Sequence, residues 1–364
     1  MIKVLHVFGI MDRGGAETII MNYYRHIDRS KVQFDFLVLR SKIGAYEKEI
    51  ENLGGKVYRI PSLFNFISHI RAIKLFFSKN NHYNIVHSHI GELGLYIYRA
   101  AKNAGVKTII AHAHKASCVK NYKWPLRIVL RTLMNKYITH RMTCGHDAAK
   151  WLFTTKSKQA LMLNNAINAK SFAFNSETRK EVRNSMGWED KFVIGDVARF
   201  STPKNHSRLL SILKEVLTKE PTSLLVLVGD KTGLYKDVHR NVEEMGLSHA
   251  VQFLGAQSDI PRLLQGMDVY CSPSLYEGLS VSMVEAQAAG LRVVTSDRVP
   301  EQIAIIPELL SFIPLSADDI TWTNALLSPY KRANTFDKIV TAGFDIHANA
   351  AWLQDFYLDK HHSH

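Results

Sequence analysis

Short apolar segments alternate with longer amphipathic ones along the whole chain. Short apolar runs followed by stretches of helical periodicity predict the buried strands of a parallel sheet and the helices that connect them. In the first half, the predicted strands are 3–8, 34–39, 56–60, 85–88, 108–112 and 141–144.

The same pattern starts again after a polar stretch at 164–190. The second set of predicted strands is 192–197, 223–229, 251–254, 268–271, 292–295 and 310–313. A chain of 364 residues is long enough for two cores of ordinary size. The fold class is therefore predicted to be α/β, with two Rossmann-like domains, each built on a doubly wound parallel sheet.

The predicted boundaries are 1–165 for the first domain and 166–345 for the second. The segments 318–327, 330–343 and 346–357 have helical patterns and no strand between them. Residues 346–364 are expected to form a helix and tail that packs on the outside or returns to the first domain. Ligands bind at the carboxyl ends of parallel strands, so we expect a binding cleft between the two domains.

Composition favours a soluble protein of the cytoplasm. No apolar run approaches the ~20 residues that span a bilayer, and the first ten residues have no signal-peptide pattern. Cys118, Cys144 and Cys271 are scattered without metal-binding or redox spacing, so no chemistry is assigned to them.

Positive charge is concentrated in the first half. Residues 1–165 contain 26 Lys and Arg against 9 Asp and Glu, a net charge of +17, whereas the remainder has a net charge of −4. Between Glu92 and Asp147 there is no acidic residue. Such a surface attracts a polyanion, either anionic lipid or nucleic acid, unless it serves only solubility. The cations of this stretch are Arg99, Lys102, Lys107, Lys115, Lys120, Lys123, Arg127, Arg131, Lys136 and Arg141.

Residues 124–137 predict an amphipathic basic helix. Pro125 suits a first helical turn, and Arg127 and Arg131 follow at helical spacing. A helix with an apolar face and cations on its flank suits the edge of an anionic membrane. Packing of that apolar face on the protein core is an equal alternative.

The sequence Gly14-Gly15-Ala16-Glu17 follows the first strand and precedes a helical stretch. Two glycines at such a turn let the backbone approach a ligand, and the helix start offers N–H groups to a phosphate. A tight turn without a ligand is the alternative. The three-glycine dinucleotide fingerprint is absent, which disfavours a dehydrogenase.

Two cations, Arg199 and Lys204, follow the strand 192–197. A guanidinium and an ammonium at a strand end would clamp a diphosphate and stabilise it as it leaves. Two solvated loop cations are the alternative.

The segment 272–286 carries two glutamates, Glu277 and Glu285, on either side of a glycine turn. With a helix starting near Ser280, the eight-residue spacing predicts a separation of about 12 Å. A retaining glycosidase holds its two carboxylates only ~5 Å apart, so this is no hydrolase pair. Two contacts along one elongated ligand fit better, with backbone N–H groups of Gly278, Leu279 and Ser280 between them. An acidic helix start without a ligand is the alternative.

Nearly the whole chain resembles the GT-B glycosyltransferases of family 4, in particular those that build bacterial capsular and exopolysaccharides. The segment from Glu277 to Glu285 is the specific signal. The supporting segments are 14–17, 110–114, Arg199 with 204–205, 228–230, 253–255 and 286–290.

The resemblance implies roles for individual residues. Glu285 would hold the donor ribose, Glu277 the sugar hydroxyls, and Arg199 and Lys204 the diphosphate. The Leu254 region would contact the base, and the 14–17 turn, with Gly14, Gly15 and Glu17, would also contact the donor. The family histidine near the transferred sugar would be His114, or His112 on the same strand face, and His114 is preferred as nearer the strand end.

The resemblance also implies the reaction: retaining transfer of a hexose or N-acetylhexosamine from a nucleotide sugar, with uridine expected rather than guanosine. The charge asymmetry motivates a further hypothesis: the second domain binds the donor, and the basic first domain faces a polyprenyl-linked or other saccharide acceptor at the inner face of the plasma membrane, with no nucleic acid expected. No Asp-x-Asp signal stands at a strand end, so neither metal nor other cofactor is expected.

Three positions depart from the family pattern: Ala198 and Arg292 replace a usual glycine and proline, and residues 229–233 replace a usual Gly-x-Gly. Two alternatives stay open, a sugar-nucleotide epimerase of the same architecture and a polyanion or nucleic-acid binder.

Overall fold

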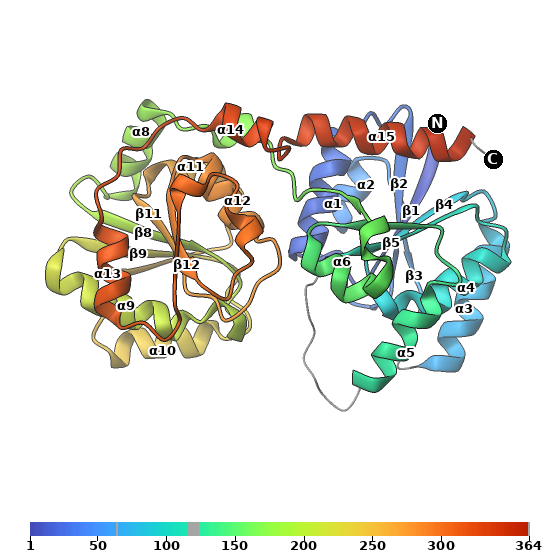
Figure 1. The fold of residues 1–364 in the computed structure, drawn as a ribbon, viewed down its shortest axis with the longest axis horizontal. Coiled ribbons are helices and arrows are strands. Elements are labelled where there is room, and N and C mark those ends of the chain that lie inside the picture. The colour runs from blue at the N-terminus through green and yellow to red at the C-terminus, as the bar shows by residue number, and fades with distance from the viewer. Residues whose placement is uncertain (63–64, 115–123, 363–364) are drawn as a thin grey trace. The chain divides into compact units, whose positions relative to one another are not determined.

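The computed structural model describes residues 1–62, 65–114 and 124–362. The chain forms two compact units, one of residues 1–166 together with residues from 345 onward, and one of residues 167–344. Each unit has its own parallel sheet with helices on both faces (Figure 1). Two parallel α/β domains are therefore confirmed.

The first unit contains a seven-stranded sheet of order β3-β2-β1-β4-β5-β6-β7. The order reverses between β1 and β4, and ligands of open parallel sheets bind at such a reversal. Its strands are β1 Ile2–Phe8, β2 Val32–Val38, β3 Val57–Arg59, β4 Ile85–Ser88, β5 Thr108–Ala113, β6 His140–Thr143 and β7 Leu161–Met162. Its helices before the second unit are α1 Gly15–His26, α2 Glu47–Asn52, α3 Phe66–Lys79, α4 Leu95–Asn103, α5 Trp124–Met134 and α6 His146–Phe153.

All six strands predicted for this half are present, with ends that differ by at most two residues. The strand β7 was not predicted. It has two exposed residues that pair with β6 at the sheet edge. So short a strand has no alternating pattern to detect.

The second unit contains a six-stranded sheet of order β10-β9-β8-β11-β12-β13. All six predicted strands are again present. The strands are β8 Phe192–Val197, β9 Ser223–Val228, β10 Val251–Gly255, β11 Val269–Ser272, β12 Arg292–Ser296 and β13 Leu310–Ile313. The helices are α7 Ala169–Phe172, α8 Ser176–Met186, α9 His206–Lys219, α10 Tyr235–Glu244, α11 Ile260–Gly266, α12 Val281–Ala288, α13 Asp319–Leu327 and α14 Phe336–Thr341.

One helix of the second unit is shorter than the sequence predicts. The pattern favours a helix over 330–343, but α14 spans only Phe336–Thr341. The preceding residues are held by Arg332, whose guanidinium donates to the carbonyls of Ala289, Gln265, Leu264 and Met267. Those side-chain bonds hold the segment before α14 on other elements of the unit.

The helix α15, Ile346–His362, packs on the first unit against α1, β1, β2 and β4 (Figure 1). It runs five residues beyond the predicted end at Tyr357. Tyr357 is fully buried against the sheet. The described part of residues 346–364 therefore returns to the first unit, which is one of the two predicted positions.

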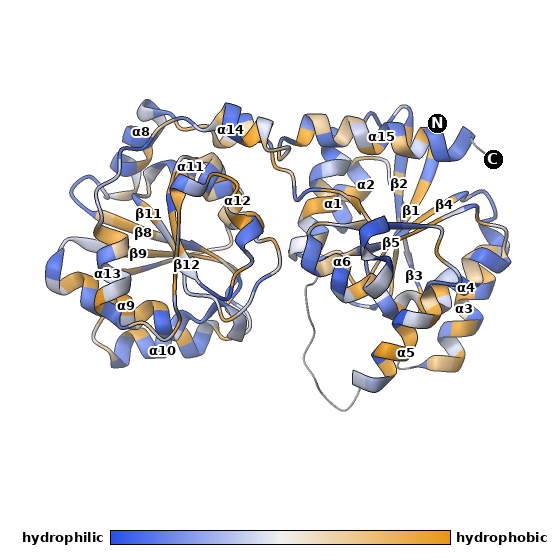
Figure 2. Ribbon diagram, in the orientation of Figure 1, coloured by the Kyte–Doolittle hydropathy of each residue, from blue (hydrophilic) through white to orange (hydrophobic). Residues whose placement is uncertain are grey.

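Colouring by hydropathy shows mostly apolar strands inside each unit and mixed helices around them (Figure 2). Among the described residues, no helix combines the length and the apolar character needed to cross a bilayer. Cys144 and Cys271 are buried free thiols, and Cys118 lies outside the described residues.

Candidate functional site

Lys204 and Glu277 form a close ion pair in the second unit. Lys204 Nζ lies 2.5 Å from Glu277 Oε1, and the Ser274 hydroxyl donates to the same oxygen at 2.9 Å. Both charged side chains are largely buried. In this partly buried pair, the ammonium can bind the phosphate of a ligand and the carboxylate can accept hydrogen bonds from its hydroxyls.

The backbone around this pair explains its placement. Lys204 ends a short 3₁₀ helix after β8, and Asn205 then takes a left-handed conformation at φ 53°. The Asn205 side chain donates to Pro273 O at 3.0 Å, and Leu275 N donates to Pro203 O at 2.8 Å. These bonds tie the loop after β8 to the loop after β11. The sequence indicated each loop separately, but not that their charged residues pair.

Arg199 is exposed on the same loop as Lys204. Two glycines pack closely against the backbone on either side of Arg199. A Cβ at Gly229 would lie 2.0 Å from Ala198 O, and a Cβ at Gly233 would lie 2.3 Å from Phe200 O. Glycine is required at both positions. These contacts define the loop path around Ala198, where the sequence departs from the family pattern.

Helix α12 begins at Val281, with Ser280 as its cap residue, as predicted. Glu277, Gly278 and Leu279 form the turn before the helix, and Glu285 lies in its second turn, partly buried. Burial raises the pKa of Glu285 to about 8. Hydroxyl groups of a ligand can donate hydrogen bonds to an ionised carboxylate. Such bonds stabilise the charged form of Glu285, which burial disfavours.

Beneath the turn lies a buried hydroxyl network. The Tyr270 hydroxyl is 2.9 Å from Ser282 Oγ and accepts from Val197 N at 3.2 Å. It therefore joins the end of β8 to the start of α12. Leu254, at the end of β10, is partly buried and packs on the core of the unit.

In the first unit, α1 begins at Gly15 after an extended Gly14. A Cβ at Gly14 would lie 2.3 Å from Glu17 Oε2, so the Glu17 carboxylate folds back over this glycine. A carboxylate in the first turn is favoured by the helix dipole. It also opposes a second anion there, so a phosphate at this helix end requires Glu17 to turn away.

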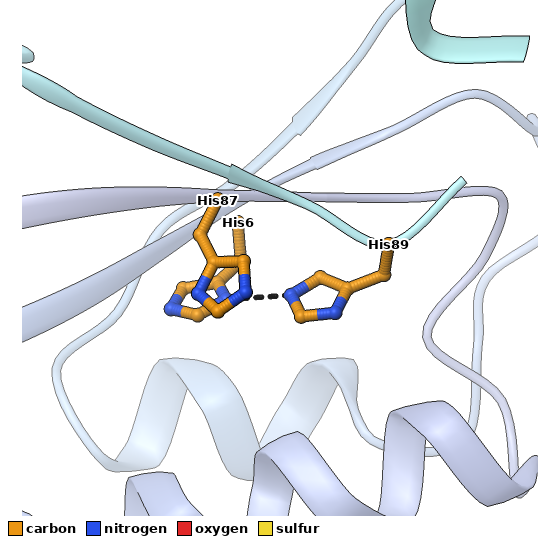
Figure 3. Close-up of side chains that lie close together, drawn as sticks. All are labelled: His6, His87 and His89. Atoms are coloured by element: carbon orange, nitrogen blue, oxygen red, sulfur yellow. Dashed lines mark hydrogen bonds between the residues drawn. The ribbon is translucent and has the colours of Figure 1, made fainter. Parts of the chain in front are cut away.

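Five histidines gather on one face of the first sheet, from three adjacent strands and the residues that follow them. His6 on β1 pairs in register with His87 on β4. Side chains alternate along a strand, so His89 lies on the same face as His87, and His114 on the same face as His112 of β5. Figure 3 shows the rings of His6, His87 and His89 close together.

Hydrogen bonds join the rings in two sets, one of His6, His89 and His114 and one of His87 and His112. His6 Nδ1 lies 3.0 Å from His89 Nε2, and His89 Nδ1 lies 2.8 Å from His114 Nε2. His87 Nε2 lies 3.2 Å from His112 Nδ1, and His87 Nδ1 lies 2.5 Å from the Tyr357 hydroxyl. Burial lowers the pKa of His6 to about 3 and the pKa values of His87, His89 and His112 well below the ordinary value. These rings are therefore neutral at physiological pH.

The two candidate histidines differ in access. His112 is fully buried, and its Nδ1 is engaged by His87. His114 follows the end of β5 and is partly exposed. Only these two histidines were predicted for the site; His6, His87 and His89 were not, although the His-x-His spacing is repeated at 87–89 and 112–114.

Two doubly wound parallel α/β domains in one chain are typical of the GT-B class of fold. A crystal structure of Alr3699/HepE from Anabaena, in complex with UDP and glucose, has the same fold. It superposes with a TM-score of 0.79 over 99% of this chain and 100% of that chain, at 18% identity.

Residues 178–308 match the family model described as "Glycosyl transferases group 1". The putative glycosyltransferase EpsF of Bacillus subtilis is 34% identical over 98% of this chain and 96% of its own length. The chain belongs to the group 1 glycosyltransferases. A second relative, named UDP-Gal:alpha-D-GlcNAc-diphosphoundecaprenol alpha-1,3-galactosyltransferase, from Escherichia coli, is 26% identical over 98% of this chain and 97% of its length.

Proposed function

We propose that this glycosyltransferase moves a hexose or N-acetylhexosamine from a UDP-sugar to a lipid-linked saccharide, with retained anomeric configuration, in the synthesis of a bacterial extracellular or capsular polysaccharide. The observation that carries the proposal is the Lys204–Glu277 pair, held beside the turn that leads to Glu285. The name of the Escherichia coli relative, with a UDP-sugar donor and a diphosphoundecaprenol acceptor, supports the substrate classes.

The second unit binds the donor in this proposal. Lys204 and Arg199 neutralise the diphosphate, and Glu277 accepts hydrogen bonds from sugar hydroxyls. Glu285 accepts from the ribose, the Leu254 region contacts the base, and the N–H groups of the 278–280 turn face the diphosphate. Without donor, Lys204 and Glu277 satisfy each other, so neither is left as an unpaired charge in a partly buried position.

The chemistry needs no protein nucleophile. The bond from the anomeric carbon to the diphosphate oxygen breaks, and the acceptor hydroxyl forms its bond on the same face. The hydroxyl proton passes to a diphosphate oxygen. Arg199 and Lys204 stabilise the charge that grows on the leaving group, which is the work a metal ion performs in other transferases. The donor site is therefore proposed to work without a metal ion.

In the same proposal the first unit binds the acceptor, and His114 is the histidine that contacts the transferred sugar. As a partly exposed ring bonded to His89, it can hold a hydrogen bond to a sugar hydroxyl. His112 is less suited because it is fully buried. The Gly14-Gly15 turn and Glu17 complete the contacts proposed for the donor.

Helix α5 supports docking of the first unit on an anionic membrane surface. Its apolar residues face solvent, with Leu126 58% and Val129 52% exposed. Its cations turn inward instead, since Arg127 pairs with Glu92 at 3.2 Å and Arg131 lies over the Trp151 ring at 3.9 Å. The expected arrangement, with these two cations on the flank, is wrong because both have partners within the unit.

The membrane proposal therefore rests on two separate features. One feature is the set of exposed apolar side chains on two helices, Leu126, Ile128, Val129 and Leu133 on α5 and Phe66, Ile67 and Leu75 on α3. The net charge of +17 attracts this domain toward anionic headgroups. Of the basic stretch, Lys115, Lys120 and Lys123 lie outside the described residues.

Calorimetric titration of UDP and GDP into the wild type and Glu285→Ala, without added metal, tests the donor site. We expect UDP to bind the wild type and not the variant. Absence of binding by either nucleotide would overturn the donor assignment. Conversion of a UDP-sugar without any acceptor would instead indicate an epimerase.

A further inference from the structure

Of the five clustered histidines of the first unit, only His114 has a role in the proposed sugar transfer. Three of the five, His6, His87 and His89, each offer one ring nitrogen within 4.8 Å of the others (Figure 3). The ring centroids are 4.4 to 5.3 Å apart. Three imidazoles from two adjacent strands thus converge on one small volume.

We infer that His6, His87 and His89 bind one divalent cation of the borderline class, such as Zn²⁺, Cu²⁺, Ni²⁺ or Co²⁺. The ion takes no part in the proposed transfer step, although His89 is hydrogen-bonded to His114, the residue proposed to contact the transferred sugar. Three protein nitrogens leave the fourth tetrahedral position for water.

The choice of cation follows from the ligands. The set contains neutral imidazoles and no carboxylate, and imidazole suits zinc, copper and nickel, whereas Mg²⁺ and Ca²⁺ require oxygen ligands.

One distance between two of the ligand atoms is close to the distance that a metal requires. Zinc–nitrogen bonds of about 2.0–2.1 Å place two tetrahedral ligand nitrogens about 3.4 Å apart. His6 Nδ1 and His89 Nε2 are now 3.0 Å apart. Separation of these rings by a few tenths of an ångström makes room for an ion between them.

The outer partners of the ligands are also in place. Metal-binding histidines hold their second ring nitrogen in a hydrogen bond that fixes the ring orientation. If His89 ligates through Nε2, its Nδ1 keeps His114 at 2.8 Å. If His87 ligates through Nε2, its Nδ1 keeps the Tyr357 hydroxyl.

The His6 ring is incompletely hydrogen-bonded. Its Nε2 is buried and has no hydrogen-bond partner among the described residues. An unsatisfied buried ring nitrogen costs free energy. A cation at His6 Nδ1 replaces the bond to His89 and fixes the proton of the His6 ring on Nε2.

The cluster offers a second set, His89, His112 and His114, and experiment separates the two. His6→Gln removes only the first set, His114→Gln removes only the second, and His89→Gln removes both. His347→Gln, an exposed histidine at the start of α15, is the matched control. His361, His362 and His364 are replaced by Gln in every sample, because clustered terminal imidazoles also bind metal.

Each protein is loaded with Zn²⁺, dialysed, and its metal content measured. We expect one Zn²⁺ per chain in the starting protein, His114→Gln and His347→Gln, and none in His6→Gln or His89→Gln. Retention by His6→Gln with loss by His114→Gln would assign the second set and overturn the proposal. No retained zinc in the starting protein would overturn it outright.

A His6→Gln chain that failed to fold would also lose metal, so a second measurement uses the starting protein alone. Co²⁺ bound by three nitrogens in a four-coordinate site gives strong visible absorption, whereas six-coordinate Co²⁺ on a protein surface absorbs weakly. We expect the strong spectrum at one equivalent. The weak spectrum alone would contradict the site.

Discussion

The raised pKa of Glu285 makes a quantitative prediction about nucleotide binding. Burial raises this pKa to about 8, so the unliganded carboxyl is mostly protonated at neutral pH. If the ribose hydroxyls donate to the ionised form, only that fraction of the protein is competent to bind, and the apparent affinity falls with that fraction.

The magnitude follows from the ionised fraction. With a pKa of about 8, roughly one half is ionised at pH 8, roughly a tenth at pH 7 and roughly a hundredth at pH 6. UDP should therefore bind about 50-fold more weakly at pH 6 than at pH 8, a difference of about 2.3 kcal/mol.

The assay is calorimetric titration of UDP at pH 6, 7 and 8 into the wild type and Glu285→Gln. UDP itself gains a proton near pH 6, and that effect is the same for both proteins. Only the difference between them reports on Glu285. We expect the wild type to lose its advantage over the variant as the pH falls from 8 to 6.

Stability should change in the opposite direction. A carboxyl whose pKa is raised in the folded state contributes stability that is present below its ordinary pKa of 4.5 and is lost as the pH rises through about 8. The melting temperature of unliganded Glu285→Gln should therefore rise relative to wild type between pH 5 and pH 8. Parallel pH profiles for the two proteins, in affinity and in melting, would refute the reasoning.

Three further predictions concern the other elements of the proposal. Lys204→Met should lower kcat/KM by about 10²–10³, since it removes a charge that stabilises the leaving group, and a rate within twofold of the wild type would contradict that role. Replacement of Leu126 and Val129 by Ser should weaken co-sedimentation with anionic vesicles without lowering the melting temperature, because both side chains are exposed; Leu130→Ser, at a buried position of the same helix, should lower it. Mg²⁺ or Mn²⁺ added to chelator-treated protein should leave the transfer rate unchanged, and a rate that depends on either ion would refute the metal-free donor site.

The sheets could be predicted well from the sequence because parallel strands buried on both faces are continuous apolar runs. The exceptions have local causes. The edge strand β7 has only two exposed residues, and the segment before α14 is held by the bonds of Arg332 to distant carbonyls. Periodicity reports neither sheet edges nor contacts between elements far apart in the chain.

The candidate site was predictable in its parts and not in its pairings. The segment 272–286 and the cations after β8 carry recognisable residue types, but the Lys204–Glu277 bond depends on how two loops meet. The histidine cluster depends on the strand order, since β1 and β4 are neighbours only because the sheet reverses there. Arg127 and Arg131 are polar residues whose partners within the unit the helical pattern could not reveal.

The packing of α15 on the first unit has a consequence for the order in which the protein folds during synthesis. Residues 1–166 leave the ribosome first, but the helix that covers β1, β2 and β4 comes from residues 346–362. The whole second unit must be translated before Tyr357 reaches His87. Until then the first sheet exposes apolar surface, as incompletely folded chains do when they aggregate. A ribosome that stalls after residue 344 therefore presents one complete unit and one uncovered sheet, a state suited to capture by a chaperone.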